Sequence, residues 1–161
     1  MPQHSQVFPA TGAAWLGRPN HDRRLPLSAR MHKSRLGAVV IDCQTQDLDE
    51  AARFWSAALG RTAETPVDPN DANYRGLEGP ADEVKVLVQA VDHPSRVHID
   101  IETNHIEAEV LRLEALGAKR IAHVKRWWVM EAPTGQRFCV VRPQRADFEE
   151  CAITWPCSGD A

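Results

Sequence analysis

Long apolar runs are missing from this sequence, and so is a surplus of positive charge. No stretch of about 18 apolar residues, the length expected of a membrane-spanning helix, occurs among the 161 residues. Lys and Arg number 19 against 22 Asp and Glu, and the formal net charge is −3. A mildly acidic chain presents no electrostatic footprint for nucleic acid. The composition therefore predicts neither a membrane nor a nucleic acid as partner.

A cysteine framework is missing as well. No CxxC motif occurs, so a structural zinc site is not expected. Cys43 and Cys139 fall in strand-like runs, while Cys151 and Cys157 lie near the C-terminal end, where a bridge between them is an open alternative. Four cysteines without a framework are typical of a reducing compartment, and we expect a cytoplasmic protein.

The N-terminal part of the chain shows no apolar periodicity. Its first 35 residues hold six Lys or Arg against one acidic residue, and prolines interrupt it repeatedly. The basic residues precede no apolar core of a signal peptide, although the Arg content leaves a transit peptide open. We predict a disordered extension over residues 1–34, a folded domain over 35–146 and a C-terminal tail over 147–161.

Two segments of the folded part resemble each other. The sequence VVIDCQTQDLDEAARFWSAALG, residues 39–60, aligns with VHIDIETNHIEAEVLRLEALG, residues 97–117. Each segment starts with the alternation of a strand, continues with the periodicity of an amphipathic helix and ends in a glycine. Asp47 and Asn104 occupy the expected N-cap positions of the two helices.

Three short strand candidates follow each of these helices. In the first repeat they cover residues 61–67, 73–78 and 83–91, and in the second 119–125, 126–132 and 136–143. The order is therefore βαβββ, twice, which predicts an α+β fold. Because one such module is too small for a good core, we expect the two to pack side by side.

This pattern resembles the vicinal oxygen chelate superfamily, with glyoxalase-like and bleomycin-resistance-like domains as the nearest kin. The resemblance rests on the paired modules, on FWSAALG at the end of the first helix, on RVHIDIET, and on PTGQRFCVV as the final hairpin. It covers residues 36–143. It implies an incomplete barrel with helices outside and a concave pocket inside, and a homodimer.

The stretch VHIDIET carries the polar face of the predicted pocket. As a strand it places His98, Asp100 and Glu102 on one face and Ile99 and Ile101 on the other. The isoleucines are expected to contact the second helix. Polar side chains in a dry interior each need a partner, which a wetted pocket supplies. A solvated face predicts a cost of about 1 kcal/mol for His98→Ala.

The first module follows the same logic. Asp42 and Gln44 are expected on the pocket side of its first strand, with Ile41 and Cys43 against the first helix. Trp127 and Trp128 point to opposite faces of their strand, so one of them is expected at the pocket, at an interface or in the core.

In metal-using relatives, the resemblance implies ligands on the first and last strands of each module, usually two His with one or two Glu. The matching positions here hold Val40, His98, Cys139 and either Leu87 or Gln89. One histidine and one thiol are too few for a tight site. We therefore expect no metal and no cofactor; the open alternative is a divalent metal at His98 with oxygen ligands from the neighbouring carboxylates.

His98 is interpreted as a pocket-wall histidine satisfied by a carboxylate such as that of Asp100. A histidine so placed can still act as an acid or base, which makes it the candidate catalytic residue. The predicted ligand-binding residues are Val40, Asp42, Gln89, His98, Asp100, Trp128 and Cys139.

These observations predict a protein that binds a small molecule in a concave pocket without the usual metal site. The alternative is a metal-dependent or His-dependent lyase, isomerase or dioxygenase. A third hypothesis is a dimerisation module whose pocket has no ligand.

Overall fold

The structure, a computed structural model, describes residues 31–66 and 68–156. The predicted N-terminal extension lies almost wholly outside the described residues, as does Cys157. In the described part no helix is long and apolar enough to cross a membrane.

The described chain contains the predicted βαβββ order twice, so the α+β prediction is confirmed. The first module consists of β1 (Met31–Gln44), α1 (Leu48–Leu59), β2 (Ala63–Glu64), β3 (Tyr74–Leu77) and β4 (Lys85–Val91), with a short 3-10 turn at Pro69–Asp71. The second consists of β5 (Arg96–Thr103), α2 (Ile106–Ala115), β6 (Lys119–Val124), β7 (Trp127–Glu131) and β8 (Arg137–Val141). A short helix α3 (Phe148–Cys151) and a strand β9 (Ile153–Pro156) follow.

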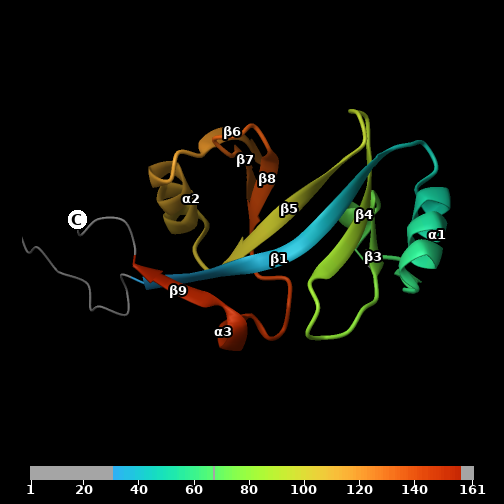
Figure 1. The fold of residues 1–161 in the computed structure, drawn as a ribbon, viewed down its shortest axis with the longest axis horizontal. Coiled ribbons are helices and arrows are strands. Elements are labelled where there is room, and N and C mark those ends of the chain that lie inside the picture. The colour runs from blue at the N-terminus through green and yellow to red at the C-terminus, as the bar shows by residue number, and fades with distance from the viewer. Residues whose placement is uncertain (1–30, 67, 157–161) are drawn as a thin grey trace, which may run out of the picture.

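One sheet joins the modules, in the order β2-β3-β4-β1-β5-β8-β7-β6, and β9 pairs with β1 outside this path. The long strand β1 runs antiparallel to β5 at the centre (Figure 1). Within each module the first and last strands pair in parallel, β1 with β4 and β5 with β8. The two halves therefore repeat the same strand pattern, as the internal similarity of the sequence predicted.

The described structure continues beyond both predicted domain limits. Strand β9 pairs with the first residues of β1, from Met31 with Pro156 to Ser34 with Ile153. Trp155 fixes this pairing, because its Nε1 donates a hydrogen bond to Ser34 Oγ at 2.8 Å. A four-residue strand is too short to show a periodicity in the sequence, so its pairing with β1 was not predicted.

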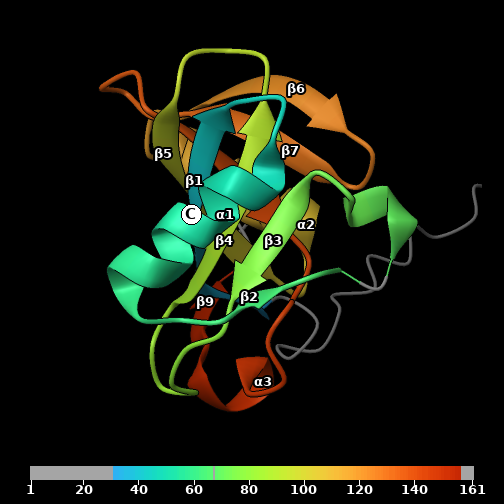
Figure 2. The same ribbon diagram turned by 90° about the vertical axis from the view of Figure 1, so that its right-hand side faces the viewer.

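Helix α1 covers the first module, in front of the sheet in the view of Figure 2. Asp47 caps it as predicted, accepting a hydrogen bond from Glu50 N at 2.9 Å. Its apolar stripe packs, through Leu48, Ala51 and Trp55, onto a core formed by Ile41, Leu77, Val86 and Val88.

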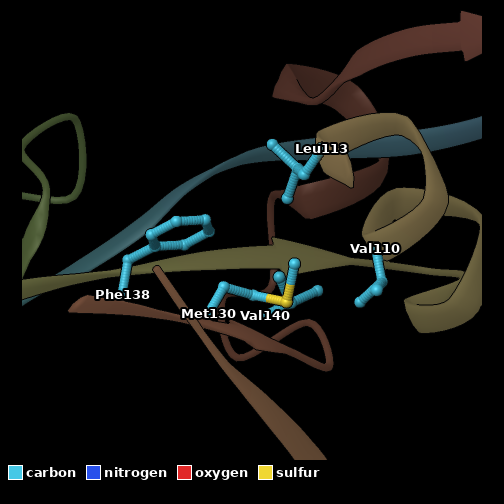
Figure 3. Packing of buried hydrophobic residues seen from close by; sticks show 5 residues of the cluster. All are labelled: Val110, Leu113, Met130, Phe138 and Val140. Carbon is cyan, nitrogen blue, oxygen red and sulfur yellow. The ribbon is translucent and has the colours of Figure 1, made fainter. Parts of the chain in front are cut away.

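Helix α2 covers the second module, but its cap differs from the prediction. His105, not Asn104, is the N-cap, and its Nδ1 accepts a hydrogen bond from Ala108 N at 3.2 Å. Asn104 instead accepts a hydrogen bond from Lys33 N through its side chain. Figure 3 shows the core beneath α2, which consists of Val110, Leu113, Met130, Phe138 and Val140.

Candidate functional site

A cavity of about 820 Å³ lies among strands of both modules. Its walls combine aromatic, aliphatic and charged side chains. The lining includes Asp42, Tyr74, Leu87, Gln89, Arg96, His98, Asp100, Trp127, Val129, Arg137 and Cys139.

Strand register brings these residues together from distant parts of the sequence. Asp42 on β1 lies beside Gln89 on β4 and beside Arg96 on β5. Four residues further along β5, Asp100 lies beside Cys139 on β8. Because side chains alternate between the two faces of a sheet, residues in these rows point to the same side. The predicted pocket face of β1 and β5 therefore lines the cavity through Asp42, His98 and Asp100, whereas Gln44, whose Nε2 donates a hydrogen bond to Asp92 O, is not part of the lining.

His98 sits between two carboxylates on the cavity wall. Its Nδ1 lies 2.9 Å from Asp42 Oδ2, and its Nε2 lies 3.5 Å from Asp100 Oδ1. Arg96 Nε donates a second hydrogen bond to Asp42 Oδ2 at 3.2 Å, and His93 Nε2 lies 3.8 Å from the same oxygen. The side chain of His98 is only 10% exposed. These contacts make a buried ion cluster that spans both modules.

The charge state of the cluster follows from its contacts. Burial alone lowers the pKa of His98, but hydrogen bonds to Asp100, Asp42 and Cys139 outweigh burial and raise that pKa to about 11. Burial alone raises the pKa of Asp42, and the bonds from His98 and Arg96 more than reverse this, so the net shift is downward. At neutral pH the imidazole is therefore protonated and Asp42 is ionised.

Two oxygens in the cluster lack a short hydrogen bond. Asp42 Oδ1 is buried and has no hydrogen-bond partner among the described residues, and Asp100 Oδ1 is buried with only the long contact of 3.5 Å to His98 Nε2. A carboxylate accepts about four hydrogen bonds, so both groups keep unused acceptor capacity. This capacity lies at the wall of the cavity, where the predicted Asp42, His98 and Asp100 are brought together.

Cys139 completes a group of possible metal donors. The ligand atoms of His98, Asp100 and Cys139 lie within 4.8 Å of one another. Burial raises the pKa of the Cys139 thiol, so the sulfur carries its proton at neutral pH. Metal binding requires a deprotonated thiol and a neutral imidazole, and both nitrogens of His98 already face carboxylates.

The superfamily's usual ligand set does not fit the first module. Val40 and Leu87 occupy two of its positions, and both are buried in a small apolar cluster with Ala38. Gln89, the other candidate position, donates a hydrogen bond to the Tyr74 hydroxyl at 2.9 Å. The grouped metal donors His98, Asp100 and Cys139 therefore all come from the second module.

Two predicted ligand-binding residues lie away from the cavity. Val40 is fully buried below the lining, because it packs against Ala38 and Leu87. Trp128 packs against the core of the second module, and it is Trp127 that lines the cavity. The sequence left the face of these tryptophans undecided, and the structure places Trp127, not the predicted Trp128, in the lining.

Glu102, the last residue of the predicted polar face of β5, has a structural role. Glu102 is fully buried and absent from the cavity lining. Its carboxylate accepts hydrogen bonds from Arg35 Nε and from Gln144 N, both at 2.6 Å. It therefore holds the segment after β8 against β1.

The predicted apolar face of β5 meets α2 only in part. Ile101 packs against the core of the second module. Ile99 is 40% exposed and lies in a shallow apolar groove with Leu116 and Pro133.

Two lining residues that contact Asp42, Arg96 and His93, were not predicted. Arg96 lies two positions before His98, so the alternation of β5 contained the signal that places it on the same face. His93 lies in the β4–β5 loop, where no periodicity applies.

A protein-family model described as a glyoxalase-like domain matches residues 38–141, well over half of the chain. The chain belongs to this family. Its resemblance to the vicinal oxygen chelate superfamily is thereby confirmed. A comparison with curated proteins gives no match.

Solved structures support the fold of this glyoxalase-like domain. A hypothetical protein from Bacillus halodurans C-125 superposes with a TM-score of 0.51 at 14% identity, over 70% of this chain and 96% of that one. Methylmalonyl-CoA epimerase from Mycobacterium tuberculosis gives a TM-score of 0.51 at 16% identity, over 68% of this chain and 87% of that one. At such low identities the likeness concerns the fold alone.

Proposed function

We propose that this glyoxalase-like domain binds a small organic molecule in the cavity without the superfamily's usual metal set. A volume of about 820 Å³ falls in the range of small-molecule sites, which is roughly 300–1,000 Å³. Such sites combine apolar and aromatic walls with a few convergent polar groups and shifted pKa values. Asp42, His98 and Asp100 are those polar groups here.

The proposal rests on the carboxylate oxygens of Asp42 and Asp100 whose acceptor capacity is not used within the ion cluster. A buried acceptor without a donor costs about 1–3 kcal/mol, and burying charges costs several kcal/mol more. Apolar side chains at these positions would avoid both costs. The presence of the cluster at a cavity wall therefore favours recognition of a ligand over a purely structural role for Asp42 and Asp100.

Catalysis of the lyase, isomerase or dioxygenase type is the second candidate function. It is favoured by the closeness of His98, Asp100 and Cys139. A protonated His98 can donate a hydrogen bond to an oxygen that gains negative charge, and Asp100 can accept a proton. A divalent metal at these three residues would require a neutral His98 and a deprotonated Cys139, which the contacts and burial of the two side chains disfavour.

The resemblance also supports a homodimer in the cytoplasm as a proposal. Light scattering coupled to gel filtration tests the homodimer. A monomer at all accessible concentrations would contradict it.

A ligand screen on the metal-free protein tests the proposed function. Compounds that raise the melting temperature are measured again with Val129→Trp, which places a bulky indole ring at the cavity wall, and with Ile121→Trp on the exposed side of β6 as control. We expect the shift to vanish in Val129→Trp and to persist in Ile121→Trp. Shifts that persist equally in both variants would contradict binding in the cavity.

A further inference from the structure

The charges of the cavity indicate one class of ligand. We infer that the ligand carries a protonated amine, which binds against the carboxylates of Asp42 and Asp100. The inference rests on the proposed function, because it concerns the ligand of the same cavity.

The donors already present in the cluster leave one side of Asp42 free. His98 Nδ1 and Arg96 Nε both reach Oδ2, at 2.9 and 3.2 Å. Oδ1 of Asp42 has no hydrogen-bond partner in the described chain and Oδ1 of Asp100 has only the 3.5 Å contact with His98 Nε2, although the two side chains are only 1% and 10% exposed. A ligand that contacts this wall therefore gains most by bringing donors.

Two cations of the lining are already paired. Arg96 makes its ion pair with Asp42. Arg137 makes an ion pair with Glu131, with Nη2 and Oε2 2.9 Å apart. Neither guanidinium is therefore a free site for an anionic ligand.

The unpaired charges of the lining favour a cation. Glu64 and Asp71 line the cavity and form no ion pair with any described residue. Lys85 is the one lining Lys or Arg in the described chain without an ion pair. Two acidic groups thus oppose one basic group. A charged donor also makes hydrogen bonds about twice as strong as a neutral donor does.

The aromatic part of the wall suits the same ligand class. The rings of Tyr74 and Trp127 line the cavity. The face of an aromatic ring attracts a cation, and the ring also buries the apolar part of the ligand to which the cation is attached. His98 adds positive charge to the wall, but both of its nitrogens face carboxylates, which share that charge.

Three probes that share a naphthalene ring and differ in the charge of their side group test the inference. Naphthylmethylamine, naphthalenemethanol and naphthoate are titrated into the full-length, metal-free protein near neutral pH, and binding is followed by protein NMR. We expect the amine to bind about tenfold more tightly than the alcohol, and the acid to bind most weakly.

An alcohol or acid that binds best would overturn the inference and leave the proposed function standing, because a molecule would still occupy the cavity. Absence of amine binding would overturn it as well. The ligand screen and its Val129→Trp variant test the proposed function separately.

A matched pair of variants locates the contact. Asp100→Asn should bring the affinities of amine and alcohol close together, whereas Asp92→Asn removes the same charge from an exposed loop and should change nothing. Circular dichroism checks the fold of each variant. If Asp100→Asn does not fold, Glu64→Gln at the exposed part of the lining must reduce the preference for the amine. An unchanged preference in the folded Asp100→Asn or in Glu64→Gln would overturn the inference.

Discussion

His98 Nδ1 lies 2.9 Å from Asp42 Oδ2, although the two residues are 56 positions apart and belong to the first strands of different modules. The antiparallel pairing of β1 with β5 sets this contact, since it places His98 beside Val40 and Arg96 beside Asp42. The ion cluster is therefore a product of how the two modules are joined. Neither module alone contains it.

Removing the imidazole should destabilise the protein strongly. His98→Ala leaves Asp42 and Asp100 near each other without their shared cation, and breaking a buried pair costs about 3–5 kcal/mol. The expected loss of unfolding free energy exceeds the cost of about 1 kcal/mol that the sequence predicted for His98→Ala on a solvated face. Denaturant unfolding of the variant and the wild type measures this loss. The double variant His98→Ala/Asp42→Asn should lose less than the sum of the single variants, and simple additivity would show that the two residues do not interact.

The contribution of His98 should depend on pH. Its pKa is about 11 in the folded chain and about 6.5 in the unfolded one, so folding binds a proton more tightly. The stabilisation is complete below about pH 6.5 and is lost as the pH rises toward 11. The unfolding free energy of the wild type minus that of His98→Ala should therefore shrink between about pH 6.5 and about pH 10. A difference that grows over this range would contradict a protonated His98.

The stabilisation by the carboxylates of Asp42 and Glu109 should be lost toward low pH instead. The hydrogen bonds of Asp42 to His98 and Arg96, and those of Glu109 to Arg112 and His32, more than offset burial and lower both carboxyl pKa values. Their stabilisation is present above the unfolded pKa values of about 4 and is lost as the pH falls below them. Glu109→Gln should therefore flatten the acid limb of a stability–pH curve. An unchanged acid limb would exclude Glu109 as a contributor.

The purified, untagged protein should contain far less than stoichiometric zinc, nickel, manganese or iron. Val40 and Leu87 supply no donor at two of the usual positions, and His98 is held in its protonated form. Elemental analysis measures the content, and an excess of chelator should leave the melting temperature unchanged. Stoichiometric metal that disappears in His98→Ala would support the metal-dependent alternative.

The C-terminal strand should stabilise the whole domain. Trp155 donates a hydrogen bond to Ser34, and Arg112 stacks over its ring at 4.1 Å from the centroid. Trp155→Ala should cost about 2 kcal/mol, less than a fully buried tryptophan because its side chain is half-buried. Ile153→Ala, on the same strand but exposed, is the control and should cost little. Equal effects of the two variants would show that Trp155 contributes no specific contact.

Alternation and the internal repeat were enough to predict the order of helices and strands along the chain and the side of the first strands that faces the cavity. They placed Asp42, His98 and Asp100 on one face correctly. They could not show how deeply that face is buried, because burial depends on segments distant in sequence. Glu102 illustrates this, since Gln144 and Arg35 cover it.

The side on which a single residue lies was harder to predict where the two faces of a strand have similar apolar character. Trp127 and Trp128 have equal apolar character, and only the pairing of β7 with β8 decides which of them enters the cavity. Glu109 lies on the buried side of α2, where its partner His32 comes from the far end of β1. Such a long-range hydrogen-bond contact leaves no periodic signal in the sequence.

The most direct test of ligand binding at the cluster is the NMR signal of the His98 ring in the metal-free protein. Compounds that raise the melting temperature should shift the ring resonances of His98 and leave those of His105, the exposed cap of α2, unchanged. That result would place the ligand at the cavity wall without a metal. Shifts that appear only after a divalent metal is added, or that spare His98 altogether, would contradict the account.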